Sequence, residues 1–261
     1  MKLTSLLFTV FLLVFSSITN YLAAKSSVEK QLASFNAQID EFVTNKQYAQ
    51  AIAFCNLHIS DSEEPSLKRA LIVSKMRLFI KSKGINDSVL DCYNQQLKLK
   101  EDEDSLDYFL SGRSEEILGH YYYKQQNIAQ AVKQLNLADS LYGLAQEYEY
   151  RVYNLNMLGT IYQLSNNLTD GLITLTRADR MLDEHLPNDS ALHIDLHIDI
   201  GLIYFKLRRY SKATVYYNQL LKYNLSKEQE AQVQNNLAII SIKENRYQDA
   251  VNFLIQAENL Y

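Results

Sequence analysis

Two histidines spaced four residues apart are the clearest candidates for chemistry in this chain. His193 and His197 lie in the stretch HIDLHID, with Asp195 and Asp199 nearby. On a helix, imidazoles at i and i+4 share one side, and this spacing can hold a metal ion. The protease version of the motif needs a Glu directly after the first His, where this chain has Ile. His197 also lies on the apolar stripe of its segment. We therefore expect a packing role, with no metal and no other cofactor.

No other group of residues suggests catalysis. The two cysteines, Cys55 and Cys92, are too few for a disulfide scaffold, and we expect both to be small buried hydrophobic residues. No Ser/His/Asp arrangement, phosphate loop or pair of catalytic carboxylates stands out from the helical background. The sequence therefore predicts a protein that is not an enzyme, with no catalytic residues.

Composition narrows the fold and the class of partner. The chain has 261 residues, 47% of them hydrophobic and 21% charged, so a core is available. Its net charge of −4 argues against a nucleic-acid binder built on a basic face. With 7 Gly and 2 Pro, it has few residues for the tight turns of an all-β sandwich or for the loops of a nucleotide-binding fold.

The first residues have the order of a secretory signal. Lys2 is followed by an apolar run, LLFTVFLLVF, and then by small residues ending at Ala24. The apolar run is short for a membrane span, which needs roughly 20 residues. We expect residues 1–24 to be a signal peptide and the protein to be exported, with a bacterial periplasm favoured by the scarcity of Cys and the lack of Trp. An uncleaved membrane anchor is the alternative.

The remainder of the chain contains a repeat. Four segments begin with an apolar residue that is followed directly by Gly or Ala. In each segment a second Ala or Gly lies 13 residues after that apolar residue. Three of the four also have a Tyr three residues after the Gly. The segments are Leu118–Ala138, Leu158–Ala178, Ile200–Tyr217 and Leu237–Ala257. The joints between the two halves match too: QQNIAQA, SNNLTDG, LRRYSKA and ENRYQDA.

This pattern resembles the tetratricopeptide repeat, W-x2-L-G-x2-Y, then A-x3-F, then P. This chain lacks the Trp and the closing Pro, and its repeat intervals of 40, 42 and 37 residues exceed the usual 34. The resemblance implies an all-α fold: a right-handed superhelical solenoid of about six antiparallel helical hairpins. The Gly column would let paired helices approach closely.

Two less regular hairpins precede the four clear ones. NKQYAQA, residues 45–51, matches the joints above, and residues 67–80 and 88–99 read as the helices of a degenerate second hairpin. We expect degenerate hairpins over 25–104 and clear repeats over 105–261, in one continuous solenoid. The acidic run 101–104 should start the next helix, and Ser226 with Gln229 predicts a capping box.

In the tetratricopeptide family, the exposed face of each first helix lines a concave groove that binds peptides or partner helices. An ordinary solvated helix face is the alternative. The family's Lys/Asn clamp for a C-terminal carboxylate is not reproduced here. By alignment, the groove residues would be Arg113, Glu116, His120, Tyr123, Lys124, Tyr153, Asn156, Thr160, Gln163, Asp195, Phe205, Lys206, Gln232, Asn235 and Lys243.

Two functions fit these expectations. The first is an exported, non-enzymatic scaffold that binds a protein or peptide partner, and not nucleic acid, in its groove. The alternative is a periplasmic sensory input domain of a membrane-bound regulator or kinase, truncated before its transmembrane and output parts. The last helix, residues 247–261, should place Leu254 against its own partner helix. Its apolar arc also includes Val251 and Ile255, and is wide enough to predict self-association.

Overall fold

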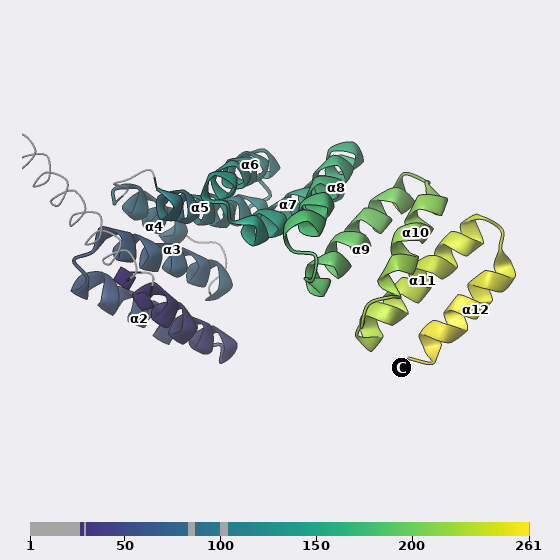
Figure 1. The fold of residues 1–261 in the computed structure, drawn as a ribbon, viewed down its shortest axis with the longest axis horizontal. Helices are drawn as coiled ribbons and strands as arrows, with labels where there is room; N and C mark the ends of the chain where they lie inside the picture. Colours follow the sequence, from purple (N-terminus) through teal and green to yellow (C-terminus); the bar gives the residue numbers. More distant parts are fainter. Residues whose placement is uncertain (1–26, 29, 83–86, 100–103, 261) are drawn as a thin grey trace, which may run out of the picture. The chain divides into compact units, whose positions relative to one another are not determined.

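A computed structural model of the chain describes residues 27–28, 30–82, 87–99 and 104–260, and all regular secondary structure in these ranges is helical. The expected signal peptide, residues 1–24, and residues 101–103 of the acidic run lie outside the described part. The chain forms two compact units, residues 1–103 and 104–261. Figure 1 shows the helices of each unit as antiparallel pairs. Six hairpins can be traced over the described residues, which confirms the all-helical fold and the predicted number of hairpins.

The first unit contains two hairpins. A helix over residues 30–44 precedes α2 (Tyr48–Asp61), and α3 (Pro65–Ser82) packs on both α2 and α4 (Ser88–Leu97). Pro65 begins α3, where its missing N–H costs no helical hydrogen bond. Cys55 and Cys92 are both buried free thiols, as expected. Burial raises the pKa of Cys55 to about 12, so this thiol stays protonated and unreactive.

The second unit contains four hairpins that share one design. Each first helix packs on its own second helix, and each second helix packs on the next first helix. Asp104 caps the start of this unit, because its side chain accepts a 2.8 Å hydrogen bond from the Asp107 backbone N–H. The helices are α5 (Ser105–Lys124), α6 (Ile128–Ala145), α7 (Tyr148–Leu164), α8 (Leu168–His185), α9 (Ser190–Lys206), α10 (Tyr210–Leu220), α11 (Lys227–Lys243) and α12 (Tyr247–Glu258).

The joint inside each of five hairpins has the same backbone geometry. The N–H that precedes the second helix reaches back to a carbonyl near the end of the first, as in the 2.9 Å bond from Asn127 to Tyr122. This is the closure of a Schellman motif, which requires a left-handed residue one position earlier. In these five joints the left-handed residues, with φ between 56° and 62°, are Lys46, Gln126, Asn166, Arg208 and Asn245. None of them is glycine, although glycine adopts this conformation most easily.

Glycine occurs instead where paired helices touch. A Cβ atom on Gly119 would lie 2.7 Å from Cγ of Leu135, and one on Gly201 would lie 3.0 Å from Cε1 of Tyr217. Gly159 faces Leu175 in the same way. The bulky residue of the second helix thus fills the space that the missing side chain leaves on the first. This confirms that the Gly column allows the close approach of the two helices.

A buried carboxylate connects three successive helices of the second unit. Asp139 on α6 accepts a 2.7 Å hydrogen bond from Arg151 Nε on α7 and a 2.8 Å hydrogen bond from Arg177 Nη2 on α8. Charge-assisted bonds of this length are stronger than neutral ones. One side chain therefore fixes the contact between the first two hairpins of this unit.

The last hairpin begins as predicted and ends differently. Ser226 and Gln229 form the expected capping box at the start of α11. Leu254 on α12 was expected to face its partner helix, and it is instead 45% exposed. The equivalent residues Leu135 and Leu175 are fully buried. The reason is that each of those lies between its own hairpin and the next first helix, whereas no described helix follows α12.

Apolar side chains gather on α12 next to Leu254. Val251 and Ile255 are about half exposed, and only Ala250 and Ala257 of this helix are buried.

Within the described ranges, no helix combines the length and the hydropathy that crossing a bilayer requires.

Candidate functional site

The first helices of the second unit, α5, α7, α9 and α11, carry the predicted groove residues. We call the side of these four helices that carries the predicted groove residues the first-helix face. On α5, two predicted residues bind each other: Arg113 Nη1 donates a 2.7 Å hydrogen bond to Glu116 Oε2. The hydroxyl of Tyr142 on α6 donates to the same carboxylate oxygen. The Arg113 guanidinium also lies over the Tyr150 ring, with Cζ 4.8 Å from the ring centroid.

This network is internal to the protein. Burial alone would lower the pKa of Arg113, but Glu116, Tyr142 and Tyr150 together outweigh burial and raise it. Both charges are therefore compensated without a partner. Arg113 and Glu116 stabilise the α5–α6 hairpin, and a ligand would have to compete with Tyr142 for the carboxylate. The sequence pattern could not reveal this, because Tyr142 lies 26 residues from Glu116.

The end of α5 presents a mixed surface. His120 and Tyr123 are partly buried, while Lys124 is exposed. Burial lowers the pKa of His120, against the opposing effect of Glu116, so the imidazole is neutral at pH 7. Tyr123 packs beside the cluster formed by the α5–α6 hairpin and α7. Of these three residues, Lys124 is the most accessible to a partner.

On α7, the structure separates the four predicted residues. Tyr153 is exposed, and Asn156 and Thr160 are partly buried. Gln163 is only 3% exposed, so it cannot line a groove. The reason is that Gln163 lies on the packed side of α7, which contacts α6, α8 and α9, whereas the next residue, Leu164, is 61% exposed.

A carboxylate from the next hairpin completes this part of the face. Thr160 Oγ1 lies 2.9 Å from Asp199 Oδ2 and donates a hydrogen bond to it. Burial raises the pKa of Asp199, with the nearby Asp195 carboxylate adding to the shift. Burial also raises the pKa of Asp195, and here Asp189 adds to the shift. Three neighbouring carboxylates thus make this part of the face acidic and incompletely compensated.

Asp199 was not among the predicted groove residues. The signal was present in the sequence, because Asp195 and Asp199 are four residues apart and share one side of a helix. The other predicted residues of α9 are Phe205, which packs beside Tyr210 with ring centroids 5.8 Å apart, and the exposed Lys206.

The last first helix, α11, adds an apolar surface to the face. The predicted residues Gln232, Asn235 and Lys243 are exposed. Between them, Ile239 is 43% exposed and Ile242 is 45% exposed, and neither was predicted. They occupy the columns that Thr160 and Gln163 occupy on α7, so the same alignment contained them.

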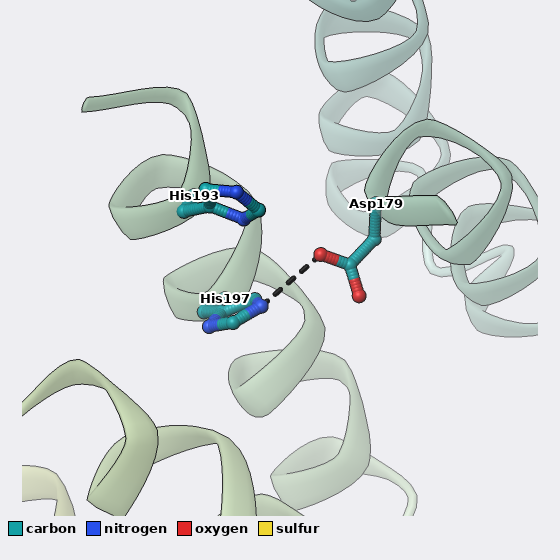
Figure 2. A group of neighbouring side chains, drawn as sticks. All are labelled: Asp179, His193 and His197. Atoms are coloured by element: carbon teal, nitrogen blue, oxygen red, sulfur yellow. Dashed lines mark hydrogen bonds and ion pairs between the residues drawn. The ribbon is translucent and has the colours of Figure 1, made fainter. Parts of the chain in front are cut away.

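A second cluster lies on the opposite side of α9 from the acidic residues. His197 Nε2 is 3.1 Å from Asp179 Oδ1 on α8, and Figure 2 shows both histidine rings of α9 beside this carboxylate. His193 Nε2 lies 3.9 Å from Asp183 Oδ1. Both imidazoles are buried, which fits the packing role expected for His197. The rings of Tyr216 and Tyr223 lie against them from α10 and the segment after it.

Comparison with solved structures identifies the fold. BtubC (BKLC) from P. vanneervenii is similar over 89% of this chain and 90% of its own length, with a TM-score of 0.67 and 16% identity. A Pseudomonas aeruginosa pilF structure matches 90% of this chain and 94% of its own, with a TM-score of 0.63 and 14% identity.

A third similar structure is a signal transduction ATPase (STAND) with a tetratricopeptide repeat sensor from Pyrococcus horikoshii. It covers 83% of this chain and has a TM-score of 0.72 at 16% identity, but the match spans 33% of that protein. No family sequence model matches the chain, and no curated protein matches it in sequence. The structural matches show that the chain has the fold of tetratricopeptide repeat proteins.

Proposed function

We propose that this tetratricopeptide repeat fold is a non-enzymatic scaffold that binds a segment of a protein partner along the first-helix face of residues 104–261. The observation that carries the proposal is that two successive first helices present an acidic surface on α9 and an apolar one on α11. Asp195 and Asp199 supply the acidic part, and Ile239 and Ile242 of the next hairpin supply the apolar part.

The chemistry of the face selects the kind of segment. A Lys or Arg of the partner would pair with carboxylates whose pKa is raised by burial and by a neighbouring carboxylate, Asp189 for Asp195 and Asp195 for Asp199. Leu, Ile or Phe of the partner would cover the two exposed isoleucines, a gain of about 25 cal/mol for each Å² of apolar surface removed from water. The partner segment is therefore basic and apolar.

Arg113 and Glu116 are not proposed as contacts, because they bind each other and Tyr142. Gln163 is not proposed either, because it is buried. The proposed contact residues are Tyr153, Asn156, Thr160, Asp195, Asp199, Phe205, Lys206, Gln232, Asn235, Ile239, Ile242 and Lys243.

We further propose that the protein is exported to the periplasm after cleavage near Lys25. Support comes from the order of Lys2, the apolar run and the small residues that end at Ala24. N-terminal sequencing of the exported protein should begin close to Lys25. An intact Met1 in the membrane fraction would instead show an uncleaved anchor.

A sensory input domain is the second candidate. The similarity to a STAND ATPase whose repeats are described as a sensor favours it, and only a third of that protein is matched. Sequencing the gene beyond the codon for Tyr261 would distinguish the two. A membrane helix followed by an output domain supports the sensor, and a stop codon supports the free scaffold.

Peptide selection tests the main proposal. The exported chain is immobilised and exposed to a library of random dodecapeptides displayed on phage, with the Ile239→Asp variant used for counter-selection. The peptides that are kept should be enriched in Lys or Arg together with Leu, Ile or Phe. Enrichment of acidic peptides, or no enrichment, would contradict the proposed chemistry of the face.

A further inference from the structure

Two helices bring four potential metal ligands to the same place. Asp179 and Asp183 lie four residues apart on α8, and His193 and His197 lie four residues apart on α9. Residues at i and i+4 share one side of a helix, so each helix presents a pair. Figure 2 shows the two imidazoles on one side of α9 with Asp179 across from them.

The donor atoms are close enough to share one ion. One ligand atom each from Asp179, His193 and His197 lies within 4.8 Å of the other two. The 3.1 Å between His197 Nε2 and Asp179 Oδ1 fits a common ion. Metal–ligand bonds of about 2.0–2.1 Å in a tetrahedral site place neighbouring donors roughly 3.3 Å apart. The three donor atoms are at most 4.8 Å apart, so side-chain shifts of no more than about 1.5 Å would bring them to this spacing.

His193 lacks partners that a packing role would supply. Its side chain is buried, with 5% of the residue exposed, and Nδ1 has no hydrogen-bond partner among the described residues. Its Nε2 atom lies 3.9 Å from the nearest ion-pair partner, Asp183 Oδ1, which is beyond hydrogen-bond distance. A neutral imidazole carries one lone pair, and a cation bound through it would give that ring nitrogen the partner it lacks in the structure.

An open hollow gives an ion access to these atoms. Its volume is ≈ 430 Å³, and the four candidate ligands line it together with residues of α10 and the segment after it. Tyr216 packs edge-on against His197, and Tyr223 stacks against His193, so both rings are held in place. Lys222 also lines the hollow, and its positive charge is the one feature that opposes a cation.

We propose that Asp179, His193 and His197 bind one divalent transition-metal ion, with Asp183 or a water molecule in the fourth position. Imidazole ligands favour Zn²⁺, Ni²⁺, Co²⁺ or Cu²⁺ over Mg²⁺ and Ca²⁺, which prefer sets of oxygen ligands. Because α8 ends one hairpin and α9 begins the next, the ion would join the second and third hairpins of the unit. The site is independent of the first-helix face, since Asp195 and Asp199 lie on the other side of α9.

Metal binding is tested on the whole chain, prepared without a polyhistidine tag and freed of metal with a chelator. Zn²⁺ should bind at one ion per chain by calorimetry and should raise the midpoint of thermal unfolding, because it binds only the folded state. Co²⁺ should give the visible absorption of a four- or five-coordinate site. His193→Gln and Asp179→Asn should each lower the Zn²⁺ affinity at least tenfold.

A matched control uses His185, which stacks on Tyr148 and is not among the residues that line the hollow. His185→Gln should leave the affinity and the stoichiometry unchanged. Circular dichroism of the metal-free variants should match that of the wild type, because both ligand substitutions keep side-chain size and polarity. The proposal is overturned if Zn²⁺ does not bind saturably. It is equally overturned if His193→Gln and Asp179→Asn bind Zn²⁺ as tightly as the wild type does.

Discussion

Thr160 on α7 donates a 2.9 Å hydrogen bond to Asp199 on α9, which links two successive hairpins across the first-helix face. The bond fixes the position of a partly buried carboxylate whose pKa burial raises above its ordinary value of 3.8. Thr160 opposes that rise, because a hydrogen bond to the charged form favours the charged form. The bond therefore links two hairpins of the face, while the charge on Asp199 still destabilises the folded state.

Asp199→Asn should stabilise the fold at neutral pH. The pKa of Asp199 is higher in the folded than in the unfolded chain, so the carboxylate destabilises the folded state above the folded pKa. That penalty disappears as the pH falls to 3.8. The asparagine oxygen can still accept the Thr160 bond. We expect a gain of at most on the order of 1 kcal/mol, since solvent screens a partly exposed group.

Urea unfolding of both proteins at pH 7 and at pH 4 measures this effect. The difference in the free energy of unfolding should be present at pH 7 and smaller at pH 4. A variant less stable than the wild type at pH 7 would show that the charge is well compensated.

Gly119→Ala should destabilise the protein even though alanine favours helices. The new Cβ would lie 2.7 Å from Leu135 Cγ, and overpacking of this kind costs about 1–3 kcal/mol. Gly143→Ala on α6 is the control, because its new Cβ would meet only the end of the Arg151 side chain, at 3.3 Å. Thermal unfolding should rank Gly119→Ala below the wild type. In the Gly119→Ala protein, Leu135→Ala should lower the free energy of unfolding by less than it does in the wild type, because the shorter side chain removes the clash.

Gln126→Gly should stabilise the α5–α6 hairpin. Gln126 has a φ of 62°, and a left-handed conformation costs a non-glycine residue about 1 kcal/mol. Gln125→Gly, one residue earlier at a φ of −80°, gains nothing and loses backbone entropy. Urea unfolding should therefore move in opposite directions for the two variants. Equal destabilisation by both would mean that the Gln126 side chain stabilises the joint.

Self-association through α12 stays a prediction. Val251, Leu254 and Ile255 are all about half exposed on this helix, a larger apolar surface than one partner helix covers. Light scattering at micromolar concentration should show a species larger than one chain. Val251→Lys with Ile255→Lys should return it to a monomer. A wild-type monomer that these changes leave unaltered would remove any role for this helix in assembly.

The sequence was sufficient for the fold because the repeat is local. The spacing of Gly119 to Ala131 lies within one hairpin, and so do the joint residues, so periodicity alone places the helices. Leu254 was misplaced because its burial depends on a following helix, which the column pattern does not contain.

The site was predicted only in part, because its chemistry depends on contacts between helices. Arg113 and Glu116 align with exposed residues of the other hairpins. Only the structure shows that they bind each other and that the Tyr142 hydroxyl donates a hydrogen bond to Glu116. Asp179 comes from α8, 18 residues before His197, and no motif connects these two positions. Ile239 and Ile242 lie in the aligned columns, but apolar residues at helical spacing are normally assigned to the core rather than to an exposed face.

The most direct test of the proposed function is the affinity of a selected basic, apolar peptide for matched variants, measured by fluorescence anisotropy. Ile239→Asp and Asp195→Lys on the first-helix face should each weaken binding at least tenfold. Ile173→Asp, at an exposed position on the second helix α8, should leave it unchanged. Binding should also weaken as salt is added, because charge pairs contribute to it. Equal affinity for all four proteins, or equal losses at Ile173 and Ile239, would contradict the assignment of the first-helix face as the binding surface.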